Sequence, residues 1–185
     1  MMTESNDQDW VRKCLEGDQE SFAMLIGRHE KAVFNVALRM TKSYAEAQDI
    51  TQAVFIKAYE KLSEYDAQYK FFSWIYRITV NEALNFIKRK RLFDELDPNQ
   101  DYPSFTHTPA DDYEESELSR NIQSALMHLK ADYRAILILK HFAGLSYHEI
   151  AYALDVPEKT VKSRLFTARQ MLKQILLKQG YIEND

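Results

Sequence analysis

The sequence predicts an all-α protein with two small helical domains joined by an acidic, proline-containing linker, the second domain containing a helix-turn-helix. Long stretches repeat apolar residues at three- and four-residue spacing, which is the pattern of an amphipathic helix. Only four glycines interrupt the 185 residues, and no segment has the convincing pattern of a strand. A change of composition in the middle of the chain separates the two halves. We therefore expect domains at 10–93 and 118–180, with the linker at 94–117.

Three long helices are predicted in the N-terminal half, from Ser21 to Met40, from Tyr44 to Leu62 and from about Phe72 to Arg91. The residues expected on their inner faces are Phe22, Leu25, Ile26, His29, Val33, Val36, Ala37 and Met40 in the first, Ala47, Ile50, Val54, Ile56, Ala58 and Leu62 in the second, and Trp74, Ile75, Ile78, Ala83, Phe86 and Ile87 in the third. The third helix is expected to end on the basic run 88–91. Cations there suit the negative end of the helix dipole, and they suit contact with phosphate equally well.

Aromatic residues are concentrated where the second helix gives way to the third. The segment from Tyr65 to Tyr76 holds six of them in twelve residues, accompanied by Lys70 and Arg77. A surface for single-stranded nucleic acid needs this combination, because bases stack on rings while cations hold the backbone. Buried aromatic residues usually belong to the core, which is the role expected of Phe71 and Trp74. For the segment as a whole, both interpretations stay open from the residues alone.

The central segment 94–117 carries nine carboxylates and no Lys or Arg, together with three of the four prolines. Prolines and charge of one sign are typical of an extended linker. The segment 118–180 has ten cations against four anions, so the net charge of −4 conceals a basic C-terminal domain. An acidic balance for the whole chain therefore does not argue against nucleic acid. The linker is either a simple tether or an anionic segment that occupies a basic channel.

The stretch from Leu145 to Leu172 is typical of a helix-turn-helix made of two short helices. Ser146 and Glu149 have the spacing of a capping box, and Pro157 suits the first turn of the second helix. Asp155 stands where such a turn usually has Gly, although aspartate tolerates the left-handed conformation better than most residues. The inward residues are expected to be Ala151, Val161 and Leu165, and the outward ones Lys159, Lys162, Arg164 and Arg169. Such a motif places its second helix in a DNA major groove, whereas an ordinary helical hairpin is the alternative.

No catalytic or metal-binding pattern is found in the sequence. The five histidines lack the spacing of a metal site, and no glycine-rich phosphate loop follows a strand. We therefore expect no enzyme activity, metal, cofactor or small-molecule substrate. Cys14 is alone, which excludes an internal disulfide, and the polar N-terminus resembles neither a signal peptide nor a membrane span. These features predict a protein of the reducing cytoplasm.

The order of these features resembles the extracytoplasmic-function (ECF) sigma factors, the small two-domain class of bacterial transcription initiation factor. The second conserved region of that family is similar to VFNVALRMTKSYAEAQDITQAVFIKAYEKLSEYD followed by FFSWIYRITVNEALNFIKRKR. The fourth conserved region is similar to ALMHLKADYRAILILKHFAGLSYHEIAYALDVPEKTVKSRLFTARQML. The resemblance covers nearly the whole chain, from Val11 to Leu177. The two halves in this order, joined by an acidic linker, are more specific than either half alone.

The resemblance implies a sigma factor that binds core RNA polymerase and directs promoter recognition and DNA strand opening. The residues implied to bind the clamp helices of the largest polymerase subunit are Asp49, Ile50, Gln52, Phe55, Lys57 and Ala58. The loop from Tyr65 to Phe72 would capture a flipped base, and the residues implied to contact the −10 element are Tyr65, Lys70, Phe71, Phe72, Ser73, Arg77, Asn81, Lys88 and Arg89. Those implied to face the −35 element are Lys159, Thr160, Lys162, Ser163, Arg164 and Arg169. The linker would pass through the RNA exit channel of the polymerase.

One residue departs from the family pattern: Ala53 stands where the family often has Glu, which leaves the electrostatic part of the polymerase contact open. An anti-sigma partner is implied by family analogy alone. The alternative function is a stand-alone helix-turn-helix regulator, which would share the C-terminal motif. The aromatic segment and the long N-terminal helices argue against that alternative, because such a regulator needs no strand-opening surface.

Overall fold

The computed structural model describes residues 4–96 and 117–182, and within them it contains helices and no strand, which confirms the all-α prediction. The elements are α1 (Glu4–Leu15), α2 (Gln19–Thr41), α3 (Tyr44–Glu60), the short 3-10 helix η1 (Leu62–Glu64), α4 (Phe71–Leu96), α5 (Glu117–Met127), α6 (Ala131–His141), α7 (Tyr147–Leu154) and α8 (Glu158–Lys178). Most of the predicted linker, 97–116, lies outside the described residues. Among the described helices, none is long and apolar enough to cross a bilayer.

Polar caps fix where the first long helices begin and end. The Asp18 carboxylate accepts a hydrogen bond from the Glu20 N–H at 3.0 Å, at the start of α2. The Ser43 hydroxyl does the same for the Glu46 N–H at the start of α3. Such caps satisfy N–H groups that have no partner within the helix. Between the two helices, Lys42 adopts a left-handed conformation (φ 57°), so the chain reverses direction within a short turn.

The helix positions agree with the periodicity for α2 and α3, but four other expectations were wrong or incomplete. The helix α1 was not predicted. The helix α4 continues to Leu96, so the basic run 88–91 lies inside the helix rather than at its end, and the dipole explanation does not apply. The helix α8 spans 21 residues and is therefore long rather than short. Ile56 was expected to face inward, yet its side chain is 54% exposed.

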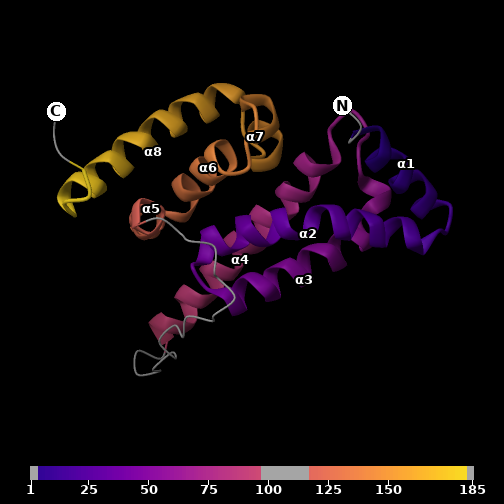
Figure 1. Cartoon of the computed structure of the whole chain (residues 1–185), viewed down its shortest axis with the longest axis horizontal. Coiled ribbons are helices and arrows are strands. Elements are labelled where there is room, and N and C mark those ends of the chain that lie inside the picture. Colours follow the sequence, from indigo (N-terminus) through magenta and orange to yellow (C-terminus); the bar gives the residue numbers. More distant parts are fainter. Residues whose placement is uncertain (1–3, 97–116, 183–185) are drawn as a thin grey trace.

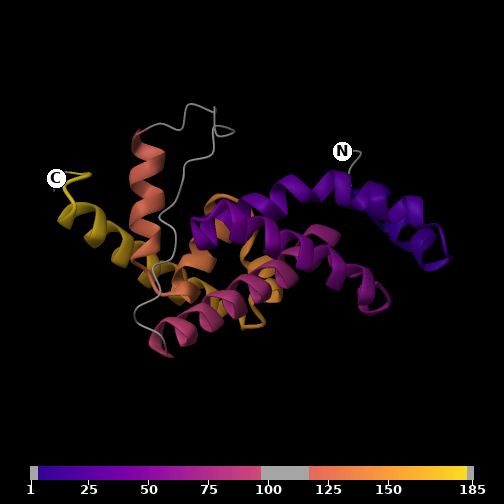
Figure 2. The ribbon, with the colours of Figure 1, turned by 90° about the horizontal axis from the view of Figure 1, so that it is seen from below.

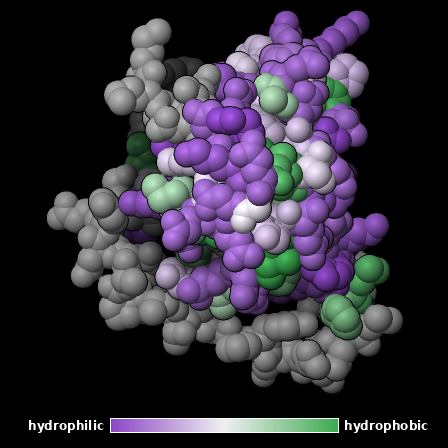
Figure 3. Space-filling view, turned by 90° about the vertical axis from the view of Figure 1, so that its right-hand side faces the viewer, coloured by the Kyte–Doolittle hydropathy of each residue, from purple (hydrophilic) through white to green (hydrophobic). Residues whose placement is uncertain are grey.

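The helices α2, α3 and α4 pack side by side, and α1 lies at one end of the molecule (Figure 1). Their shared core is formed by residues such as Leu25, Val33, Val54 and Ile75, all almost completely buried. Seen from the end at which α1 lies, the surface is largely hydrophilic, and apolar side chains show only as small separate areas (Figure 3). That is the composition of an ordinary solvated surface.

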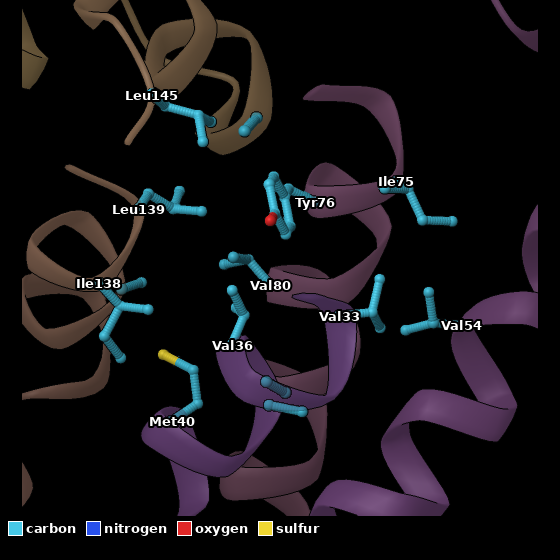
Figure 4. Packing of buried hydrophobic residues seen from close by; sticks show 14 of the residues in the cluster. Val33, Val36, Met40, Val54, Ile75, Tyr76, Val80, Ile138, Leu139 and Leu145 are labelled. Carbon is cyan, nitrogen blue, oxygen red and sulfur yellow. The ribbon is translucent and has the colours of Figure 1, made fainter. Parts of the chain in front are cut away.

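The helices α5 to α8 form a second group that packs directly against α2 and α4 (Figures 1 and 2). Figure 4 shows Ile138 and Leu139 of α6 directed toward Met40 of α2 and Val80 of α4. All four side chains are completely buried, and one apolar cluster runs through both groups. Burying this surface from water is favourable and roughly proportional to its area. The two groups of helices are therefore held together by a shared core.

One buried cation lies at the boundary between the two groups. The Arg134 guanidinium donates hydrogen bonds at 3.1 Å to the carbonyl oxygens of Leu126, Met127 and Leu129, around the turn between α5 and α6. It also donates to the carbonyl of Met40, in the last turn of α2. Burial lowers the pKa of Arg134 below its usual value, but a guanidinium stays charged in proteins. The fixed fork of N–H donors thus ties the α5–α6 turn to the end of α2.

Candidate nucleic-acid and partner interfaces

The loop between η1 and α4 is held from inside by its own aromatic residues. The Tyr65 hydroxyl donates to the Tyr69 carbonyl oxygen at 2.6 Å, and its ring packs against Phe71 and Trp74. Burial raises the pKa of Tyr65 above its usual value. Phe71 and Trp74 are buried in the core, as the alternative interpretation of the aromatic segment expected. Of the predicted −10 residues, Tyr65 and Phe71 therefore support the loop rather than line its outer surface.

The outer surface of the loop carries Tyr69, Lys70 and Phe72. The Lys70 ammonium lies 5.4 Å from the centre of the Phe72 ring, which in turn meets Tyr76 edge-on. An ammonium near a ring face is attracted by the ring quadrupole. Ser73, another predicted residue, is completely buried, and its hydroxyl has no hydrogen-bond partner among the described residues. The loop thus carries two half-buried rings beside an exposed cation, and Ser73 is buried.

A polar stripe continues from the loop along the outer face of α4. Arg77, Asn81, Asn85 and Lys88 follow one another at helical spacing, and the last three are exposed, as is the neighbouring Arg89. All of these residues except Asn85 are predicted from the sequence to contact the −10 element. Its signal was present in the sequence, because Asn85 stands four residues after Asn81 and three before Lys88. This stripe and the loop together form what we call the α4 surface.

The helix-turn-helix has the local structure that its sequence predicts. The Glu149 N–H donates to the Ser146 hydroxyl at 3.2 Å, and the Ser146 N–H donates to the Glu149 carboxylate at 2.8 Å, which completes the capping box. Asp155 is left-handed (φ 54°) and ends α7. Pro157 stands immediately before α8, one position earlier than expected. Ala151 is only half-buried, whereas Ala153 is the small residue that is fully buried.

The outer face of α8 gathers the predicted −35 residues. Lys159, Lys162, Ser163, Arg164 and Arg169 are exposed and Thr160 is half-buried, while Val161, Leu165 and Ala168 face the core. Phe166, which was not predicted from the sequence, lies among the exposed residues with 66% of its surface accessible. Its position one residue after the buried Leu165 was the available signal, because neighbouring residues on a helix face different directions.

Two of these cations have partners within the protein. The Lys162 ammonium lies 3.1 Å from the Glu158 carboxylate, one turn earlier on the same helix. Arg169 donates to the imidazole Nε2 of His141 at 3.4 Å. Burial, together with the nearby charges of Arg169 and Lys140, lowers the pKa of His141. The neutral ring is therefore favoured, and it can accept the hydrogen bond that orients Arg169.

A groove of about 790 Å³ runs between α2 and α3. Its lining is mostly apolar and aromatic: Phe22, Ile26, Glu30, Lys31, Phe34, Tyr44, Gln48, Thr51, Gln52, Phe55, Ile56, Tyr59 and Glu60. The rings of Phe22 and Tyr59 meet edge-on at 5.0 Å. Ile56 and Tyr59 are about half exposed. A half-open apolar groove of this kind is suited to receive a helix from another protein.

The residues predicted to bind polymerase do not all lie on one surface of the structure. Gln52 and Phe55 line the groove. Lys57 is turned to the other side, where its ammonium lies 2.5 Å from the Glu82 carboxylate of α4. Ile50 and Ala58 are buried, and Asp49 is exposed but does not line the groove. Ile56 and Tyr59 were missed, although each lies on the same helical face as Gln52.

No group of three or more His, Cys, Asp or Glu side chains in the described part of the chain is arranged to hold a metal ion. The candidate sites therefore consist of two cationic surfaces, on α4 and α8, and one apolar groove.

Comparison with known proteins identifies both halves of the chain. Residues 25–93 match the model of sigma-70 region 2, and residues 119–172 match that of sigma-70 region 4. The RNA polymerase sigma-H factor of Pseudomonas aeruginosa is 30% identical, with 95% of this chain and 96% of the relative aligned. The ECF RNA polymerase sigma-E factor of Haemophilus influenzae is 32% identical, with 94% of this chain and 96% of the relative aligned. The ECF RNA polymerase sigma factor SigW of Bacillus subtilis is 30% identical, with 90% of this chain and 94% of the relative aligned.

Solved structures share the fold. The sigma factor RpoE of Bartonella quintana, in complex with the anti-sigma factor NepR, superposes with a TM-score of 0.71, at 24% identity over 85% of this chain and 97% of that one. CnrH, in complex with the cytosolic domain of CnrY, superposes with a TM-score of 0.70 at 22% identity, and the superposition covers 92% of this chain and 97% of that one. Two sigma-70 regions in the expected order, with full-length relatives at 30% identity or more, establish the family. The chain belongs to the ECF RNA polymerase sigma factors, which direct promoter recognition at transcription initiation.

Proposed function

We propose that this sigma factor consists of two functional units, at 10–93 and 118–180, and that it binds its partners through three surfaces. The α2–α3 groove binds core RNA polymerase, the α4 surface binds the −10 element and opens the strands, and the outer face of α8 reads the −35 element. The observation that carries the proposal is the contrast between one apolar groove and two cationic, ring-bearing faces. Apolar grooves receive protein helices, whereas cations and exposed rings suit nucleic acid. The free energy of binding to promoter DNA drives strand opening, and the chain supplies no catalysis of its own.

The direct test is a gel shift on a promoter found by mapping transcripts after induced expression. The chain alone, core polymerase alone and the two together are compared at physiological salt. We expect sequence-specific binding only from the mixture, because contacts to a few phosphates weaken steeply with salt. Tight specific binding by the chain alone, unchanged by polymerase, would instead make it a stand-alone regulator.

The α4 surface gives a test of strand opening. Asn81 is exposed, so replacing it with Ala should change the free energy of unfolding by less than about 0.5 kcal/mol. Open-complex formation should fall, because the amide would no longer contact DNA. Permanganate reactivity of unpaired thymines measures this directly. Gln174→Ala removes an exposed amide outside both DNA surfaces and serves as the control. A collapse of the melting temperature in Asn81→Ala would show that the amide is structural.

The α8 face gives a test of −35 recognition. Replacing both Lys162 and Arg164 with Ala should weaken promoter binding by the holoenzyme, and Arg164 alone should account for roughly 1–3 kcal/mol if it contacts a base edge. The Lys162–Glu158 pair is exposed and contributes little to stability. Lys173→Ala with Lys178→Ala removes two exposed cations further along the same helix. Equal promoter output from the two double variants would mean that only total charge matters.

Phe166 adds a further contact to the proposed −35 surface. Its exposed ring lies one turn after Lys162 and Ser163, on the face proposed to enter the major groove. Apolar side chains there contact the methyl group of thymine. We propose that Phe166 contributes sequence preference, while the lysines hold the phosphate backbone.

An anti-sigma factor is a further proposed partner. The sigma factor RpoE of Bartonella quintana, which shares this fold, is described in a complex with the anti-sigma factor NepR, and CnrH, which also shares the fold, is described in a complex with the cytosolic domain of CnrY. The present chain offers the same fold and an exposed apolar groove. Pull-down with the tagged full-length chain from its own host, compared before and after addition of core polymerase, tests whether a partner competes for these surfaces.

A further inference from the structure

The helix α1 is joined to α2 by a buried carboxylate that none of the three proposed surfaces uses. Asp7 is 6% exposed, and its carboxylate lies 2.6 Å from the Arg28 guanidinium and 3.0 Å from Nε2 of His29, both on α2. The Arg28 guanidinium also lies over the Trp10 ring of α1, 4.1 Å from its centre. Charge-assisted hydrogen bonds and a cation–ring contact both have a defined geometry. Together they fix the position of α1 on α2.

The same carboxylate orients a ring that packs against the inner side of the 65–72 loop. A carboxylate paired with a guanidinium only accepts hydrogen bonds, so Nε2 of His29 donates to Asp7. This hydrogen bond fixes the tautomer and the orientation of the imidazole. The His29 ring lies 5.2 Å from the ring of Phe71, the first residue of α4, and Phe71 in turn meets Tyr65 at 5.7 Å. A continuous series of contacts therefore joins Asp7 to the inner rings of the loop.

The residue after Asp7 holds the loop directly. Gln8 is exposed, and its side-chain amide donates to the Ala67 carbonyl oxygen at 3.0 Å. Ala67 stands between Tyr65 and Tyr69, which are joined by the hydrogen bond inside the loop. Burial is the main cause of the raised pKa of Tyr65, a hydrogen bond with Gln8 opposes the rise, and the negative charge of Asp7 adds to it. Two consecutive residues of α1 therefore act on the loop, one on its backbone and one on its inner rings.

We propose that α1 positions the 65–72 loop for capture of a −10 base, with Asp7 and Gln8 as the positioning residues. Asp7 sets the inner rings through His29, and Gln8 sets the backbone at Ala67. The inference rests on the proposed role of the loop in binding the −10 element. A buried ion pair adds little net stability, because desolvation offsets the attraction, so the Asp7 contacts matter chiefly for the arrangement of the loop. A loop that is already ordered loses less conformational entropy when it binds a base.

The test removes the contacts of α1 one at a time. Gln8→Ala is the decisive variant, because Gln8 is exposed and its replacement should leave the fold intact. Its control is Gln174→Ala, which removes an exposed amide of α8. Asp7→Ala removes both carboxylate contacts, and its control is Asp9→Ala, which removes an exposed carboxylate of the same helix that pairs with the exposed Arg12. Asp7→Asn keeps the shape and one acceptor oxygen, so it should lie between Asp7→Ala and the unmodified chain.

Each full-length variant is combined with core polymerase, and open-complex formation is followed by the permanganate reactivity of a thymine outside the substituted position. The measured quantity is discrimination, the ratio of open-complex formation on the mapped promoter to that on a promoter with one base changed in the −10 or the −35 element. We expect −10 discrimination to fall about threefold or more in Gln8→Ala and about tenfold in Asp7→Ala, because one hydrogen bond changes an equilibrium by roughly two- to tenfold. The two control variants should differ from the unmodified chain by less than about 1.5-fold.

Discrimination at the −35 element separates positioning from a loss of folded protein. A destabilised chain would form fewer open complexes on every promoter and would keep both ratios, whereas a displaced loop lowers the −10 ratio alone. Equal −10 discrimination by Gln8→Ala and Gln174→Ala would overturn the role of α1. Should circular dichroism show that Asp7→Ala is unfolded, the comparison of the two glutamine variants decides.

A separate double variant tests the proposed function on which the inference rests. Lys70→Ala with Phe72→Ala changes the loop itself and leaves α1 unaltered. If this double variant loses −10 discrimination while Gln8→Ala and Asp7→Ala keep it, the positioning role of α1 is refuted and the proposed function stands. If the double variant keeps −10 discrimination, the loop is not the −10 surface and the proposed function fails.

Discussion

Replacing Arg134 with Met is expected to reduce the free energy of unfolding by about 3 kcal/mol or more. Arg134 is 6% exposed, and its guanidinium donates to four backbone carbonyl oxygens. Met fills much of the same space but donates no hydrogen bond, so the four acceptors would be left buried and unpaired. Each unsatisfied buried group costs about 1–3 kcal/mol, although neighbouring losses are not additive. Urea unfolding followed by circular dichroism measures the difference.

The controls for this prediction separate geometry from charge. Arg120→Met changes an exposed arginine on α5 and should alter stability by less than about 0.5 kcal/mol. Arg134→Lys keeps the charge but lacks the planar fork, so it should fall between Met and the unmodified chain. If Arg134→Met and Arg120→Met unfold at the same urea concentration, water reaches the carbonyls and Arg134 is not a structural tie.

The positions of α2, α3 and the helix-turn-helix could be predicted because their determinants are local. Apolar spacing, the Ser146–Glu149 capping box and the left-handed Asp155 all act within a few residues along the chain. The helix α1 escaped prediction because it buries few apolar residues, among them Val11, in an otherwise polar stretch. The end of α4 also differs, because the basic run 88–91 predicts the end of the helix whereas the helix continues to Leu96.

The packing of one half on the other could not be predicted from the sequence. Periodicity indicates that Val80 or Ile138 is buried, but it does not identify the partner that buries it. The same limit applies to the aromatic segment, where spacing alone did not separate Tyr65, whose ring packs inside the loop, from Tyr69, whose ring stacks on Tyr152. The cations of α8 were easier to place, because two buried residues, Val161 and Leu165, fix which side of the helix faces solvent.

Ile56 shows how an error of this kind can point to a candidate functional position. An isoleucine in an amphipathic helix was assigned to the core, yet the core face of α3 is supplied by Ile50, Val54 and Ala58. Ile56 instead faces the α2–α3 groove, where it stays half exposed. A large apolar side chain left in contact with water, inside an apolar groove, is a candidate anchor for a partner protein.

Ile56→Glu is therefore expected to weaken binding to core RNA polymerase by at least about a hundredfold, which corresponds to about 2.7 kcal/mol. A carboxylate buried against an apolar partner surface loses its hydration and gains no counter-charge in return. Because Ile56 is 54% exposed in the free chain, the free energy of unfolding should change by less than about 0.5 kcal/mol. Competition of each variant against the fluorescently labelled chain for core polymerase gives the affinities.

The matched control is Met24→Glu. Met24 lies on α2, is 53% exposed and does not line the groove, so it adds the same charge to an equally exposed apolar position. Long-range repulsion from polymerase would then affect the two variants alike, whereas loss of an anchor would affect Ile56→Glu alone. Equal affinities would mean that the groove is not the polymerase surface, and the contact would have to be sought elsewhere on α3, beginning with the exposed Asp49. A hundredfold difference between the variants would place the clamp helices in the groove beside Gln52 and Phe55.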